Sequence, residues 1–121
     1  MRKILIAVVL LLAAASCGGS NERAVTVEHV AFAPATLEID AGAEVTWTNR
    51  DAGVAHTATS GAPGDAGVPG LGGGTPPRPD GLFDGEMDGD GAKFSFTFDE
   101  PGRYAYFCRV HQSMTGEIVV R

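Results

Sequence analysis

The sequence predicts an all-β protein, an antiparallel Greek-key β-sandwich or barrel of about six to eight short strands. Apolar and polar residues alternate over short segments, and these segments are separated by Gly, Pro and Asp residues. No segment after residue 16 keeps a period of 3.6 residues, so no helix is expected in the folded part. The 121 residues are enough for one domain and not comfortably for two.

The first expected strand contains a change of phase. Val25 and Val27 alternate with polar neighbours, and Val30 and Phe32 then take up the apolar side again. The apolar side chains thus change from odd-numbered to even-numbered positions between Val27 and Val30. This change predicts a β-bulge near residues 28–29.

The other expected strands show plain alternation. They cover residues 37–40, 45–48, 93–98, 104–107 and 118–120. The turn at Pro101–Gly102 is followed at once by Tyr104, which resembles the tyrosine corner of Greek-key sandwiches. We expect Tyr104 to have a structural role.

Residues 1–16 are expected to be a signal peptide of the lipoprotein type. A basic start is followed by the twelve apolar residues 4–15, which are too few to span a bilayer. The small residues 13–16 then lead into Cys17, as in a bacterial lipobox. We therefore expect a lipid on Cys17, a tether over residues 17–23 and one folded domain over 24–121. The protein would then be exported and anchored on the outer face of the cytoplasmic membrane or held in the periplasm; ordinary cleavage near residue 15 would also export it.

A Gly- and Pro-rich insertion is expected at residues 60–79, where little apolar material is present to anchor the chain. The acidic segment 80–91 that follows is expected to form solvated turns, with Leu82, Phe83 and Met87 contacting the core. Its alternating acidic residues leave a calcium site as a weaker alternative, because the segment lacks the closing Glu of a calcium loop.

The charge balance excludes nucleic acid as a partner. The chain has nine Lys+Arg and 15 Asp+Glu, a formal net charge of −6, and loss of residues 1–16 would leave seven against 15, or −8. No basic cluster follows the signal segment. A surface of this sign repels phosphate backbones and anionic lipid surfaces.

The C-terminal segment carries a set of soft metal ligands. Cys108, His111 and Met114 lie within seven residues, directly after an expected strand. A thiolate with two imidazoles and a weak axial thioether describes an electron-transfer copper site. Cys108 would be a lone thiol in an oxidising compartment if Cys17 is lipidated, and a metal would then occupy it. A Cys17–Cys108 disulfide is the alternative, as is plain core packing of Cys108 and Met114.

The second imidazole has to come from another segment. His56 ends a loop that leaves the strand at 45–48, and two such loops at one end of a sandwich bring their residues together. His29 is expected in the first strand, at the bulge or facing solvent. We therefore expect His56 as the second ligand. Met87 is the rival axial methionine, but its acidic segment lies about twenty residues before Cys108, so we expect Met87 in the core.

In combination, these motifs resemble those of the cupredoxins, small type 1 (blue) copper proteins. The resemblance is carried by residues 32–34, 41–49, 56–57, 94–98, 101–104 and 108–120. The spacing Cys-x2-His-x2-Met is similar to that of the amicyanin group. The chain departs from the pattern at Thr57, because cupredoxins often have an Asn there that ties the two ligand loops together.

The resemblance implies a cupredoxin-like fold with one Cu+/Cu2+ ion per chain, bound by His56, Cys108, His111 and Met114. It implies a one-electron carrier rather than an enzyme, with redox proteins (a cytochrome, a dehydrogenase or a membrane oxidoreductase) as donor and acceptor. These partners would dock near His111, where its ring edge meets apolar neighbours such as Val54, Ala55 and Val110. We expect a monomer, held at the membrane by a lipid on Cys17.

Other function classes find less support in the residues. A copper oxidase or nitrite reductase needs a second copper, and only His29 would be left to bind it. A dinuclear copper centre needs a second nearby cysteine. Copper handling or storage in the periplasm stays open as the alternative function, although only Met87 and Met114 would survive processing. A metal-free sandwich would not turn blue with copper.

Overall fold

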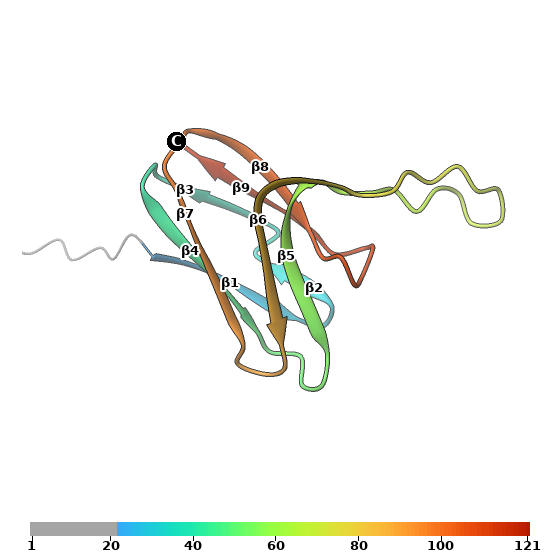
Figure 1. The fold of residues 1–121 in the computed structure, drawn as a ribbon, viewed down its shortest axis with the longest axis horizontal. Helices are drawn as coiled ribbons and strands as arrows, with labels where there is room; N and C mark the ends of the chain where they lie inside the picture. Colours follow the sequence, from blue (N-terminus) through green and yellow to red (C-terminus); the bar gives the residue numbers. More distant parts are fainter. Residues whose placement is uncertain (1–21) are drawn as a thin grey trace, which may run out of the picture.

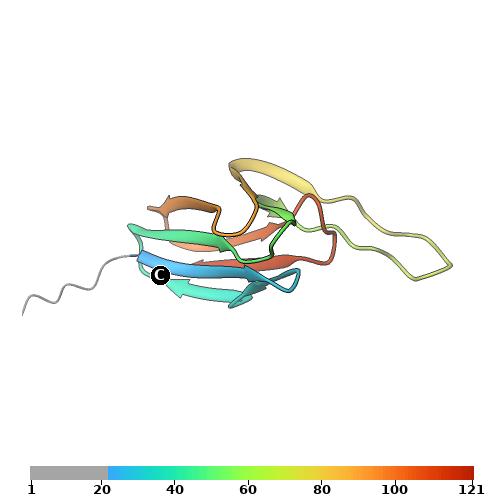
Figure 2. The ribbon, with the colours of Figure 1, turned by 90° about the horizontal axis from the view of Figure 1, so that it is seen from below.

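The computed structural model describes residues 22–121, which form a sandwich of two β-sheets (Figures 1 and 2). Within this range there are nine strands: β1 Glu22–Glu28, β2 Ala31–Ala33, β3 Thr36–Ile39, β4 Ala43–Asn49, β5 Ala55–Ala62, β6 Arg78–Asp88, β7 Lys93–Phe98, β8 Gly102–Phe107 and β9 Thr115–Val120. One sheet has the order β2-β1-β4-β7 and the other β3-β9-β8-β5-β6. The described residues contain no helix long and apolar enough to cross a membrane.

The predicted sandwich is confirmed, but its sheets are not purely antiparallel. β1 pairs with β4 in parallel, and β3 pairs with β9 in parallel, while the other strand pairs are antiparallel. β1 also begins at Glu22, two residues before the predicted start of the domain. The alternation of side chains reports which face is buried and carries no information about strand direction.

Trp47 lies at the centre of the core. Alternate residues of β4 are buried, and Trp47 itself is 0% exposed. Its ring packs against four aromatic side chains from three other strands, with centroid separations of 5.4–6.4 Å: Phe83, Phe94, Phe98 and Tyr106. Such contacts combine apolar burial with favourable ring geometry. The predicted inward row of β7 is confirmed, since Phe94, Phe96 and Phe98 pack on this core.

The first two strands are joined by a tight hairpin turn where a bulge was predicted. His29 and Val30 have φ values of 55° and 56°, so both adopt the left-handed conformation of a two-residue turn. Val27 pairs with Phe32 across this hairpin, and Val30 is 41% exposed rather than part of the apolar face. The apparent change of phase therefore marked a reversal of the chain.

The acidic segment 80–91 was predicted to form turns. This was wrong for residues 80–88, which belong to strand β6, whereas residues 89–91 do form a turn. Phe83, Gly85 and Met87 face inward, while the residues between them are exposed. The alternating acids that suggested a calcium loop are thus the outward face of a strand. Phe83 and Met87 contact the core as predicted, whereas Leu82 is 44% exposed.

The Gly- and Pro-rich insertion forms an arm between β5 and β6. β5 and β6 extend into the predicted insertion up to Ala62 and Arg78, and residues 63–77 project from the sandwich as a ribbon (Figures 1 and 2). Bridges at Asp65–Thr75 and Val68–Gly72 hold its two sides together. No residue of 63–77 is buried.

Tyr104 has the structural role predicted for it. Its hydroxyl donates a 2.7 Å hydrogen bond to the carbonyl oxygen of Glu100, four residues earlier. This bond fixes the chain where it enters β8.

Candidate metal centre

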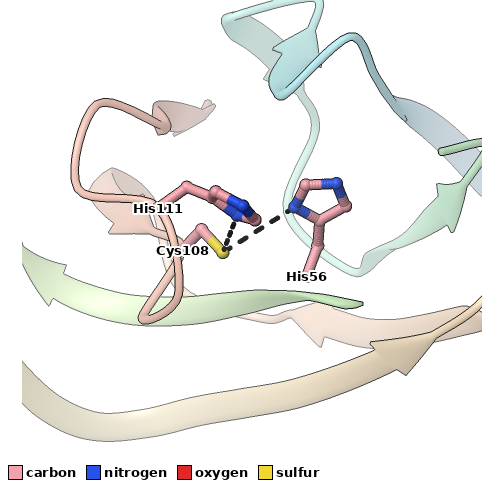
Figure 3. A group of neighbouring side chains, drawn as sticks. All are labelled: His56, Cys108 and His111. Atoms are coloured by element: carbon pink, nitrogen blue, oxygen red, sulfur yellow. Dashed lines mark hydrogen bonds between the residues drawn. The ribbon is translucent and has the colours of Figure 1, made fainter. Parts of the chain in front are cut away.

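The antiparallel pairing of β5 and β8 brings the predicted ligands together at one end of the sandwich. Thr59 is opposite Phe107, so the beginning of β5, with His56, lies beside the end of β8, where Cys108 follows. His111 lies in the loop between β8 and β9, and its side chain reaches the same position. Figure 3 shows the three side chains converging.

The atoms of these side chains are placed as ligands of one ion. The Sγ of Cys108 lies 3.9 Å from Nδ1 of His56 and 3.8 Å from Nδ1 of His111 (Figure 3). These separations are long for a hydrogen bond. A sulfur about 2.3 Å and a nitrogen about 2.0 Å from one metal are about 3.7 Å apart at a trigonal angle. All three ligand atoms lie within 4.8 Å of one another, so the residues fit a metal with two imidazoles and a thiolate.

Met114 belongs to the same loop. Its N–H donates to the carbonyl oxygen of His111 at 3.0 Å, and its carbonyl oxygen accepts the N–H of Cys108, also at 3.0 Å. Its side chain is 1% exposed. Met87 is in the core as predicted, and it is also the cross-strand partner of His56. No pattern in the sequence predicts this pairing.

His29 lies outside the cluster of ligand atoms found among residues 22–121. It occupies the exposed β1–β2 turn, and its backbone N–H bonds to the carboxylate of Asp51 at 2.7 Å. Cys108 is buried as a free cysteine. Cys17 lies outside the described residues, as do the predicted signal segment and most of the tether.

Asp51 orients the buried imidazole, a role that the sequence did not reveal. Its Oδ2 is 2.8 Å from Nε2 of His56, whose side chain is 0% exposed. Because a carboxylate oxygen only accepts hydrogen bonds, Nε2 carries the ring hydrogen, and the unprotonated Nδ1 faces Cys108. The N–H groups of Val30 and His29 also bond to Asp51, and with His56 they lower the pKa of this carboxyl.

Asn49 closes the loop between β4 and β5 from the inside. Its Nδ2 donates to the carbonyl oxygens of Val54 at 2.8 Å and Met87 at 3.1 Å, and its Oδ1 accepts the N–H of Asp51 at 2.9 Å. Asn49 is fully buried, so these bonds satisfy a polar group that would otherwise destabilise the core. The result is a fixed position for the residues that precede His56.

Thr57 ties the two ligand segments together in place of the expected Asn. Its N–H donates to the Sγ of Cys108 at 3.3 Å, and its Oγ1 accepts the N–H of Arg109 at 2.9 Å. On the outer side, the guanidinium of Arg109 bonds to Asp84 and Glu86, and these two carboxylates raise the pKa of Arg109.

Comparison with known proteins also indicates a copper-binding protein. Residues 20–121 match the model of a family described as copper binding proteins, plastocyanin/azurin family. A chloroplastic plastocyanin of Tetradesmus obliquus is 37% identical over 93 residues, which are 74% of this chain and 58% of that protein. The chain therefore spans less than two thirds of the length of this relative.

Solved structures of copper proteins share the fold. A reduced Cu(I) variant of amicyanin is 30% identical, with a TM-score of 0.60 over 81% of this chain and 80% of that one. A purple cupredoxin from Nitrosopumilus maritimus is 27% identical, with a TM-score of 0.61 over 81% of this chain and 98% of that one.

Proposed function

This chain belongs to the plastocyanin/azurin family of copper-binding proteins, its cofactor is copper, and we propose that it is a mononuclear type 1 copper protein that carries single electrons between redox proteins. The observation that carries the proposal is the approach of Cys108 Sγ to Nδ1 of both His56 and His111, at 3.9 and 3.8 Å.

Each proposed ligand has a distinct part. Cys108 would supply the thiolate, His56 and His111 would supply the two imidazoles, and Met114 would supply a weak thioether. Bound copper would supply the change between cuprous and cupric states. Since backbone and side-chain hydrogen bonds hold these residues in place, little of the protein would have to move when an electron arrives or leaves.

The redox partners would dock around His111. This side chain is partly exposed, whereas His56 is 1% exposed. Val110 beside it is 58% exposed and Val30 is 41% exposed. These side chains provide apolar contact area where the path of an electron from the metal to the surface would be shortest. A small apolar patch suits the weak, short-lived interface of a monomeric electron carrier.

The test is the visible and electron paramagnetic resonance spectrum of the purified chain after addition of one equivalent of Cu(II). We expect an intense blue band and narrow copper hyperfine splitting. Cys108→Ser should abolish the band, because oxygen does not replace the sulfur as charge-transfer donor. His29→Asn is the matched control: it removes a histidine outside the cluster, keeps the turn conformation that Asn tolerates, and should leave the band intact.

A colourless Cu(II) complex in the unmodified chain would contradict the proposal. Uptake of several copper ions per chain without a blue band would instead favour copper storage or handling.

We also propose that the protein is exported and anchored through a lipid on Cys17. The basic start, the apolar segment of twelve residues and the small residues before the cysteine support this. When the full chain is expressed in a bacterium, it should fractionate with membranes. The Cys17→Ser variant should appear in the soluble periplasmic fraction, and a membrane location that survives the substitution would rule out the lipid.

A further inference from the structure

Arg109 connects the ligand loop to the edge strand β6. It directly follows Cys108, yet its guanidinium reaches across β5, with Nε 3.1 Å from Asp84 and Nη2 3.2 Å from Glu86. Asp84 and Glu86 stand opposite Thr59 and Thr57 in the β5–β6 register. The side chain of Arg109 therefore lies over a row of two buried threonines.

The hydroxyl protons of these threonines have only one consistent arrangement. The Oγ1 of Thr59 is 2.7 Å from Oδ1 of Asp84 and 2.9 Å from Oγ1 of Thr57. A carboxylate only accepts, so Thr59 gives its single proton to Asp84 and must accept from Thr57. Thr57 thus donates to Thr59, and its oxygen accepts the N–H of Arg109 at 2.9 Å.

These bonds close a ring. It runs from the N–H of Arg109 through the hydroxyls of Thr57 and Thr59 to Asp84, which is bound in turn by the guanidinium of Arg109. Thr57 and Thr59 are 3% and 1% exposed, so water does not compete for their hydroxyl groups, whereas the side chains of Arg109 and Asp84 are 39% and 50% exposed. Hydrogen bonds aligned in one direction through a buried region strengthen one another.

We propose that this ring positions the thiolate of Cys108 and thereby helps to set the reduction potential. Thr57 connects the ring to the thiolate. Its hydroxyl belongs to the ring, and its backbone N–H donates to Cys108 Sγ at 3.3 Å. A hydrogen bond to the thiolate stabilises its negative charge and weakens its donation to the oxidised metal. Arg109, Asp84, Thr59 and Thr57 are positioning residues, and their effect depends on the copper site proposed above.

Thr59→Val tests the ring in the full chain, because valine keeps the shape of threonine and lacks the hydroxyl. Without its acceptor, the hydroxyl of Thr57 turns away, and the N–H···S bond weakens. The thiolate then donates more strongly, and the relative affinity for Cu(II) over Cu(I) should rise about tenfold. For a one-electron couple this is a potential about 59 mV lower.

Voltammetry measures the potential, and amide hydrogen exchange at Arg109 in the diamagnetic Cu(I) form reports the ring directly. Exchange at Arg109 should accelerate in Thr59→Val, while Thr59→Ser should restore both the slow exchange and the potential. Arg103→Gln is the matched control, since it removes an exposed Arg–Glu pair with a 2.8 Å contact between β8 and β9 that does not reach the ligands. It should change neither quantity.

A wild-type potential in a folded, blue Thr59→Val variant would overturn the ring as a determinant of potential, as would a raised potential. An equal shift in Arg103→Gln would mean that the potential responds to surface substitutions in general and not to the ring. If Thr59→Val fails to fold, Asp84→Asn removes the charge from the same ring, and the same readouts apply. Absence of a blue site in the unmodified chain would refute the proposed function instead, so the two failures are distinguishable.

Discussion

The orientation of the His56 imidazole depends on one carboxylate. Asp51 holds Nε2 of His56 at 2.8 Å and also accepts the N–H groups of His29 and Val30. The last two residues have positive φ without being glycine, a conformation with a steric cost. Asp51 therefore stabilises a strained turn and fixes a ligand with the same side chain.

Asp51→Asn should raise the reduction potential. A carboxylate that accepts the Nε2 proton increases the basicity of Nδ1, and a more basic ligand favours Cu(II). The neutral amide weakens this effect and lowers the affinity for Cu(II) by about tenfold or more. Voltammetry of the copper form gives the sign. Asp40→Asn is the control, because Asp40 is an exposed acid that pairs with Arg121 at the other end of the sandwich. An unchanged or lower potential in Asp51→Asn would refute the role.

Met114→Leu should retain copper and raise the potential, because loss of a weak thioether donor disfavours the cupric state. Leucine has nearly the volume of methionine, so the free energy of unfolding should change by less than about 1.5 kcal/mol. The chain provides its own control in Met87, equally buried and paired with His56. Met87→Leu should leave the potential unchanged. If instead Met87→Leu raises it and Met114→Leu does not, Met87 is the axial ligand.

At the scale of single elements, β6 depends on a glycine that leaves room for a ring. A Cβ built on Gly85 would lie 2.0–2.4 Å from three atoms of the Phe94 ring. Phe94 stacks on Trp47 with a centroid separation of 5.6 Å, so it has little freedom to move away. The missing side chain of Gly85 is thus part of the core packing.

Gly85→Ala should lower the free energy of unfolding by about 1–3 kcal/mol, the usual cost of overpacking. Urea denaturation measures this change. Phe94→Leu frees space at the same position, so the double variant should lose less stability than the sum of the two single variants. Additive losses would show that Gly85 and Phe94 do not compete for space.

The same glycine explains why β6 could not be predicted. Gly and Asp are rare in strands, and the side-chain pattern of residues 80–91 indicated turns. What makes the segment a strand is tertiary: the inward Gly85 faces a ring from β7, and Asp84 and Asp80 are held by partners on β5. By contrast, strands with large apolar side chains on alternate residues, such as β4 and β7, were predicted because the pattern itself encodes burial.

The residues of the site also fall into those that the sequence pattern predicts and those that it does not. Cys108, His111 and Met114 are contiguous, and thiol, imidazole and thioether are rare enough together to indicate chemistry. The structure brings His56 together with Cys108 and His111. Their role as metal ligands stays a prediction, as does the position of the Met114 sulfur relative to them. Asp51 and Arg109 were missed, because an acid or a base in a loop is usually solvated. Only the fold brings them against the ligands.

At the scale of the whole molecule, the proposed ligands gather at the end of the sandwich where β8 ends and β5 begins. β5 lies between β8 and β6 in one sheet, and the side chains of Asp84 and Glu86 on β6 bond to Arg109 beside Cys108. The aromatic core around Trp47 fixes the two sheets against each other. The arm at residues 63–77 leaves from this same end, beyond the last paired residues of β5 and β6 (Figures 1 and 2).

The base of the arm forms one wall of a groove beside His111. Gly64, Asp65 and Ala66 line one side of a cavity of about 570 Å³, and residues 111–113 line the other. The groove lies next to the surface where we propose that redox partners dock. The arm therefore shapes the surroundings of His111 without supplying a ligand.

Replacement of residues 63–77 by Asn-Gly should leave the blue spectrum and the reduction potential unchanged. Ala62 and Arg78 are already paired, and Asn-Gly suits a two-residue hairpin turn between them. None of the removed residues is buried, so no core contact is lost, and the shorter loop lowers the entropic cost of closure. Denaturation should show equal or higher stability. The rate of electron exchange between oxidised and reduced copies should change, since the groove beside His111 is opened. A shifted potential would mean that the arm also holds the ligand loop, and an unchanged exchange rate would mean that it lies outside the docking surface.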